Sequence, residues 1–88
     1  MKIVDKEIEM ISITNRHGII KPIRFRYQSG EDEMQVIKIH KVTEQSKQKM
    51  AGKVYIVYKC QAIIDNNCMK IFEVRYFLEK CTWILYKI

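Results

Sequence analysis

The sequence predicts an all-β protein, a single antiparallel meander of five or six strands that forms a curled sheet or a small barrel. Isoleucine and valine together number 21, against four for leucine and alanine, and β-branched side chains favour strands over helices. The 88 residues have room for one hydrophobic core, so we expect a single domain over residues 1–88. Glycine and proline total four, and most of them punctuate short turns between alternating runs.

The first part of the chain contains two alternating runs. We expect residues 1–7 to form an N-terminal extension and the first strand to cover Ile8–Thr14. Asn15–Gly18 has the composition of a turn and leads into a second strand over Ile19–Gln28. Pro22 lies early in this second run, where its missing N–H fits an edge strand or the start of a strand.

The middle of the chain contains a third run and a polar connection. We expect a strand over Met34–Val42, preceded by an acidic, solvated turn at Glu31–Glu33. Because Val36 and Val42 break strict alternation, a bulge or burial on both sides is expected at one end. Residues 43–53 are polar and basic, and we expect a long basic loop with one helical turn at most.

The last third predicts three consecutive strands, over Val54–Ile64, Met69–Leu78 and Thr82–Ile88. A tight second turn would place Trp83 and Leu85 on the core side.

The first hairpin of this region is best closed by a three-residue loop, Asp65–Asn67. A two-residue loop would mix charged and apolar residues on both faces, whereas the longer loop separates them. The longer loop also places Lys59 opposite Glu73 and gives Asn67 a left-handed conformation. The core side of the hairpin then contains Val54, Ile56, Tyr58, Cys60, Ala62, Phe72, Val74, Tyr76 and Leu78.

The other side of the same hairpin has more apolar residues than is usual for a solvent-exposed face. Two interpretations stay open: the sheet folds over this side and buries it, or the side is an interface with a protein partner or a second copy. We favour a non-enzymatic binding or assembly module, at least transiently dimeric, for which Phe77→Glu would give a folded monomer. The candidate interface residues are Tyr55, Val57, Ile63, Ile71 and Phe77.

The formal net charge of +6 favours anionic partners. The alternative function is therefore a small β-barrel that binds nucleic acid, since such barrels stack bases on aromatic side chains in a basic groove. The sequence has nine aromatic residues but no aromatic RNA-binding motif, and the same charges would also suit a solvated strand face. The candidate anion or nucleic-acid face consists of Arg24, Arg26, Lys38 and Lys41.

The sequence carries no catalytic, cofactor or metal signature. The three glycines are isolated, so no phosphate-binding loop is present, and His17 and His40 lie too far apart for a metal motif. Cys60, Cys68 and Cys81 are expected to be free thiols, and only a spatial accident would pair a cysteine with His40. The N-terminus lacks the apolar core of a secretory signal, and no run is long enough to cross a bilayer, so a cytoplasmic location is expected.

Five segments together resemble short uncharacterised single-domain proteins of Gram-positive anaerobic bacteria. The resemblance covers most of the chain from about Lys21. It implies a bacterial, intracellular, single-domain protein with no assigned activity, and it transfers no functional residues. The segments are Phe25-Arg26-Tyr27, Val36–Ile39, Tyr58–Ala62, Phe72–Tyr76 and Cys81–Leu85.

Overall fold

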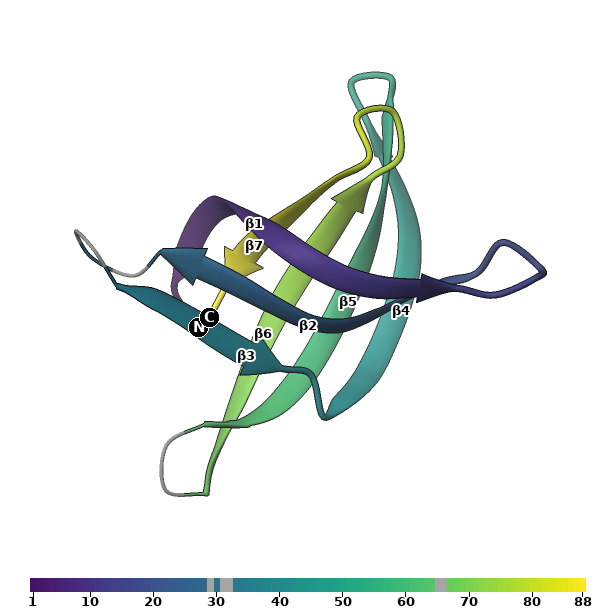
Figure 1. The fold of residues 1–88 in the computed structure, drawn as a ribbon. Coiled ribbons are helices and arrows are strands. Elements are labelled where there is room, and N and C mark those ends of the chain that lie inside the picture. Colours follow the sequence, from purple (N-terminus) through teal and green to yellow (C-terminus); the bar gives the residue numbers. More distant parts are fainter. Residues whose placement is uncertain (29, 31–32, 65–66) are drawn as a thin grey trace.

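The computed structural model describes residues 1–28, 30, 33–64 and 67–88, and among these it is all-β (Figure 1). Seven antiparallel strands form one sheet in the order β3-β2-β1-β7-β6-β5-β4. The sheet curls into a half-barrel, so the predicted fold class is confirmed, although the strands number seven and not five or six. The strands are β1 (Ile3–Thr14), β2 (Ile20–Gln28), β3 (Met34–Lys38), β4 (Lys41–Met50), β5 (Lys53–Ile64), β6 (Cys68–Phe77) and β7 (Thr82–Lys87).

The two chain ends lie side by side in the half-barrel (Figure 1). β1 pairs with β7, and backbone hydrogen bonds of 2.8 and 3.0 Å join Lys2 and Ile88 in both directions. The expectation that residues 1–7 form an extension is therefore wrong, because β1 begins at Ile3. The pairing with β7 shifts register between Ile3 and Lys6, where Asp5 has φ 46°. This irregularity interrupts the alternation of apolar and polar residues from which a strand is predicted.

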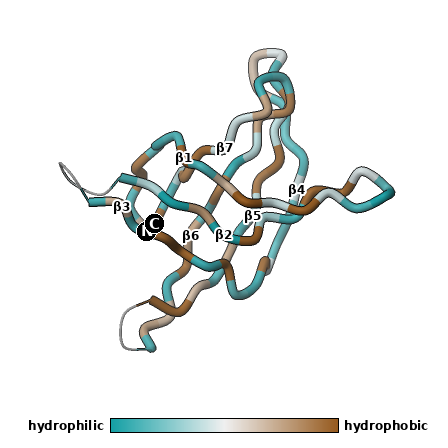
Figure 2. The backbone as a smooth tube through the Cα atoms, in the orientation of Figure 1, coloured by the Kyte–Doolittle hydropathy of each residue, from teal (hydrophilic) through white to brown (hydrophobic). Residues whose placement is uncertain are grey.

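The hydrophobic core lies on the inner face of the curled sheet, and hydrophobic segments alternate with hydrophilic ones along the strands (Figure 2). The predicted inner positions from Ile56 to Ala62 in β5 and from Phe72 to Tyr76 in β6 are confirmed, as are Trp83 and Leu85 in β7. Val54, at the start of β5, is half-buried and lies outside the core cluster. Leu78 differs: it follows the end of β6 and stays 38% exposed. The most buried core residues are Phe25, Ile37, Tyr58, Cys60, Ala62, Phe72, Val74, Trp83 and Leu85.

The hairpin of β5 and β6 has the predicted register. Ile64 pairs with Cys68, and Lys59 lies opposite Glu73, as a three-residue loop requires. Asn67 has φ 66°, the predicted left-handed conformation, whereas positions 65 and 66 of the loop lie outside the described residues.

The segment expected as a basic loop is a strand. β4 covers Lys41–Met50, and Ala51 and Gly52, with φ 50° and 80°, form the turn into β5. Because β4 is an edge strand with most side chains exposed, its sequence needs no apolar alternation and looks like a loop.

The run expected over Met34–Val42 is divided at a corner. β3 ends at Lys38, and β4 begins at Lys41 after the corner residues Ile39 and His40. The predicted irregularity is a bulge between Val42 and Glu44. The predicted turn at 31–33 lies mostly outside the described residues.

The half-barrel stays open between its two edge strands. β3 and β4 are the first and last strands of the sheet order. The corner between them is held by two backbone hydrogen bonds, from Ile39 N to Ile23 O (2.9 Å) and from His40 N to Gln61 O (2.8 Å). Beyond that corner the first part of β2 faces β4 across a groove. We call this groove, between residues 20–23 and 41–45, the seam.

Candidate binding faces

The aromatic residues predicted on the outer face of the β5–β6 hairpin are already packed against each other. Tyr55 lies opposite Phe77, and their rings stack with centroids 5.0 Å apart. The Arg75 guanidinium lies 3.4 Å from the ring centre of Tyr86 and 5.2 Å from that of Tyr55. Tyr55 is 6% exposed and Val57 is 9% exposed. The chain itself therefore buries most of this aromatic end.

The charges at the centre of this face pair differently from the sequence expectation. Glu73 is only 5% exposed, and its carboxylate accepts a 2.8 Å hydrogen bond from Nε of Arg75, two residues along the same strand. Lys59, although opposite Glu73 in register, forms its ion pair with Glu44 at 3.3 Å. The prediction missed this pair because it read β4 as a loop.

The aliphatic end of the same face is open to solvent. Ile63 and Ile71 are 46% and 52% exposed, and Met69, directly opposite Ile63, is 55% exposed. The predicted register already placed Met69 there, but the candidate interface omitted it. We call Ile63, Met69 and Ile71 the outer patch. The predicted interface is thus divided by Lys59 and Glu73 into a packed aromatic end and an exposed aliphatic end.

The predicted anion face is assembled only in part. Arg24 and Lys38 lie directly opposite each other on β2 and β3, and both are exposed. Neither has a carboxylate within ion-pair distance among the residues that the structure describes. Arg26 is already neutralised by Glu9 at 2.7 Å, and Lys41 lies on another strand, opposite Gln61.

The aromatic side chains of β2 do not accompany these cations. Phe25 is buried and packs on Phe72 with ring centres 5.5 Å apart. Tyr27 packs against the same core, and its hydroxyl donates to the side-chain oxygen of Gln35 at 3.1 Å. Bases stacking on β2 would need exposed rings beside Arg24, and these two rings face the core.

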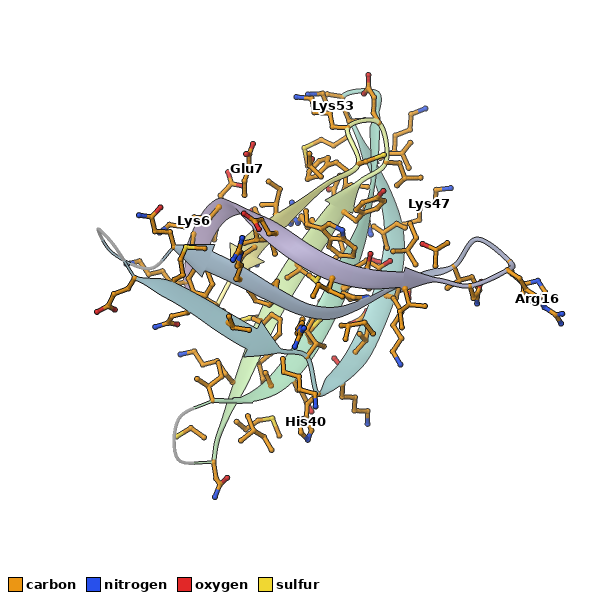
Figure 3. The ribbon with its side chains drawn as sticks, viewed as in Figure 1. Lys6, Glu7, Arg16, His40, Lys47 and Lys53 are labelled. Atoms are coloured by element: carbon orange, nitrogen blue, oxygen red, sulfur yellow. The ribbon has the colours of Figure 1, made fainter. Side chains whose placement is uncertain are left out.

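The seam combines two strand edges with basic side chains. One wall is formed by Ile20, Lys21 and Pro22, and the other by residues 42–45 of β4. The seam continues along the corner, where Lys21 and Pro22 meet His40 and Lys41 (Figure 3 labels His40). Tyr58 reaches across it from β5 and donates a 2.7 Å hydrogen bond to the carbonyl oxygen of Ile20.

Two buried groups near the seam are held in their neutral forms. Burial raises the pKa of the Tyr58 hydroxyl from about 10 to about 12, so that it keeps its proton, and its role as a hydrogen-bond donor, further into the alkaline range. Burial likewise raises the pKa of the Cys60 thiol to about 12, which removes its nucleophilic thiolate form.

Free thiols and metal-ligating residues form no further candidate site in the described part of the chain. Cys60, Cys68 and Cys81 are free cysteines, as predicted, with the last two exposed. Across residues 1–28, 30, 33–64 and 67–88, no three His, Cys, Asp or Glu residues lie close enough to hold a metal ion.

The chain matches no protein-family model, no curated protein and no solved structure. The described residues include no helix with the length and apolar character needed to cross a bilayer. The outer patch, the Arg24 and Lys38 pair, and the seam are three surfaces that the described residues offer to a partner.

Proposed function

We propose that the chain is a small cytoplasmic, non-enzymatic binding and assembly module that associates with a second copy through its outer face. The observation that carries this proposal is the outer patch. Three large apolar side chains, each at least 46% exposed, meet on one face of one hairpin. Single exposed apolar residues are ordinary, but a contiguous group of them is typical of interaction sites.

A symmetric dimer covers such a patch without requiring a different partner surface. In a two-fold interface the same patch meets itself, so the aliphatic residues of one copy cover those of the other. Lys59 and Gln61 border the patch on β5 and supply the polar rim that such interfaces have.

The experiment is sedimentation of the full chain over a range of concentrations, together with an Ile63→Lys/Ile71→Lys double variant. We expect dimer for the parent chain and monomer for the double variant. Ile11→Lys/Ile13→Lys is the matched control, because it adds the same charge at two residues of β1 that are 52% and 59% exposed, away from the patch. A parent chain that remains monomeric at the highest concentration would contradict self-association.

The second candidate function is binding of a nucleic acid through β2 and β3, and the Arg24 and Lys38 pair supports it. Like charges placed directly opposite on neighbouring strands are destabilising, and a phosphate between them would relieve the repulsion.

Binding of a single-stranded oligonucleotide at several salt concentrations tests this alternative. We expect Arg24→Gln and Lys38→Gln each to reduce the salt dependence, because each removes about one phosphate contact. Arg26→Gln is the control, since Glu9 already neutralises Arg26. Equal effects of all three substitutions would point to general charge attraction.

A further inference from the structure

The free edge of β4 is the longest unpaired strand edge in the described part of the half-barrel. β4 is the last strand in the sheet order and pairs only with β5. It covers Lys41–Met50, whereas the other edge strand, β3, covers Met34–Lys38. After the bulge between Val42 and Glu44 the ladder with β5 is regular through Met50. An extended free edge of this kind presents backbone donors and acceptors to any added strand.

The side chains along this edge have a defined charge pattern. Lys47 and Lys49 lie opposite Ile56 and Val54, so both lysines are on the same side of the strand. Both are exposed, and neither has an ion-pair partner among the described residues (Figure 3 labels Lys47). The other side of β4 carries Ser46 and Gln48, which are neutral, and Glu44, which is paired with Lys59.

The wall of the seam formed by β2 does not pair with the backbone hydrogen-bonding groups on the free edge of β4. Pro22 has no N–H, and the carbonyl oxygen of Ile20 already accepts the Tyr58 hydroxyl at 2.7 Å. A tyrosine side chain therefore holds β2 across the groove, in place of a backbone ladder. Of the two walls, β4 is the one that offers an edge for another strand.

We propose that β4 binds an extended acidic segment of a partner protein as an additional strand of the sheet. The charge pattern selects acidic side chains at alternate positions, next to Lys47 and Lys49, with small polar residues between them, next to Ser46 and Gln48. The proposal rests on the binding-module function proposed above, but it uses a different surface and names the class of partner.

Lysines on an edge strand also protect proteins from edge-to-edge aggregation. That role predicts no preference for acidic strands and no backbone pairing. The two roles are therefore distinguished by whether an acidic peptide forms a ladder with β4.

The experiment is a nuclear magnetic resonance titration of the full chain with a short synthetic peptide that alternates glutamate with threonine. We expect shifts and slower amide exchange over residues 44–50, with binding that weakens as salt is added. The Lys47→Glu/Lys49→Glu variant should bind about tenfold more weakly. Its control is Lys2→Glu/Lys70→Glu, which makes the same change in net charge away from β4 and should bind like the parent chain.

A second peptide with the same charges, but N-methylated at its backbone amides, separates strand addition from simple attraction. We expect it to lose binding, because it cannot form the ladder. Equal binding of both peptides, or no binding of either, would overturn the proposal. Shifts confined to Ile63, Met69 and Ile71 would also overturn it. Sedimentation of the chain alone tests the proposed dimer independently of these outcomes.

Discussion

The hydroxyl of Tyr58 and the carbonyl oxygen of Ile20 are 2.7 Å apart, and this hydrogen bond joins β5 to β2 across the seam. It connects positions 38 residues apart in the chain. Tyr58 is fully buried and also packs on Trp83, with ring centres 5.4 Å apart. One side chain thus belongs to the core and also joins β2, one wall of the seam, to β5, the strand that pairs with the other wall.

Tyr58→Phe should loosen the seam without unfolding the protein. The variant keeps the ring but removes the donor to Ile20, so we expect a loss of about 1–2 kcal/mol of unfolding free energy. Urea denaturation measures this loss, and amide exchange over residues 20–23 should become faster. Tyr27→Phe is the control, because the Tyr27 hydroxyl bond to Gln35 is exposed. Equal costs for the two variants would contradict a special role for the seam bond.

Stability should decline at alkaline pH through two buried groups. The pKa values of Cys60 and Tyr58 are both raised to about 12 by burial, from ordinary values of 9 and 10. A raised pKa means that the folded state keeps a proton that the unfolded chain releases. The contribution of each group to the free energy of unfolding is therefore complete below pH 9. It is lost as pH rises towards 12, by at most about 1.4 kcal/mol per pH unit for each group.

Urea denaturation between neutral pH and pH 11 should therefore show a shallower decline for Cys60→Ala and for Tyr58→Phe than for the parent chain. All other titratable groups are the same in the three proteins, so the comparison isolates the two buried groups. Three parallel curves would contradict the assignment.

Cys60→Ser should be more destabilising than its small change in size suggests. Cys60 is fully buried opposite Phe72, and its thiol lies 3.7 Å from the carbonyl oxygen of Tyr58. A shorter, more polar hydroxyl in this apolar place should cost about 1–3 kcal/mol. Thermal denaturation measures the change against Cys68→Ser, which alters an exposed thiol and should have little effect.

Phe77→Glu tests how far the proposed dimer interface extends. Phe77 is half-buried and stacked on Tyr55, so the variant should stay folded but lose about 1–2 kcal/mol of stability. We also expect it to be monomeric, because an interface over the whole outer face would desolvate the new carboxylate. Circular dichroism and sedimentation together give the result. An unfolded variant would mean that the aromatic end belongs to the core, and a folded dimer would confine the interface to the outer patch.

The register of the β5–β6 hairpin was predictable because one loop length separates charged from apolar residues and the other mixes them. β4 was not predictable, since an exposed edge strand has no face that must be apolar, and Gln45 and Lys47 are tolerated where an interior strand would need hydrophobic residues. The strand pattern placed Arg75 on the outer face correctly. It contained no information that the guanidinium would lie over Tyr86 or pair with Glu73, because those contacts depend on side-chain directions.

The candidate anion face shows a similar limit. The pairing of β2 with β3 places Arg24 opposite Lys38. The alternation of apolar and polar residues in each strand predicted that both side chains face solvent, but it did not show that the two residues lie opposite each other. Arg26 belonged to the same predicted face, yet the pairing of β1 with β2 places Glu9 opposite it, and the ion pair offsets its charge.

The strand order also constrains how the chain folds. β1 to β3 and β4 to β7 are two runs of neighbouring hairpins, each formed by contacts between strands consecutive in sequence. The pairing of β1 with β7 joins the two runs, and its outermost bonds connect Lys2 to Ile88. Closing so long a loop carries a large entropic cost, which local hairpins avoid. We therefore expect the two meanders to form early and their union through β1 and β7 to be the slow step of folding.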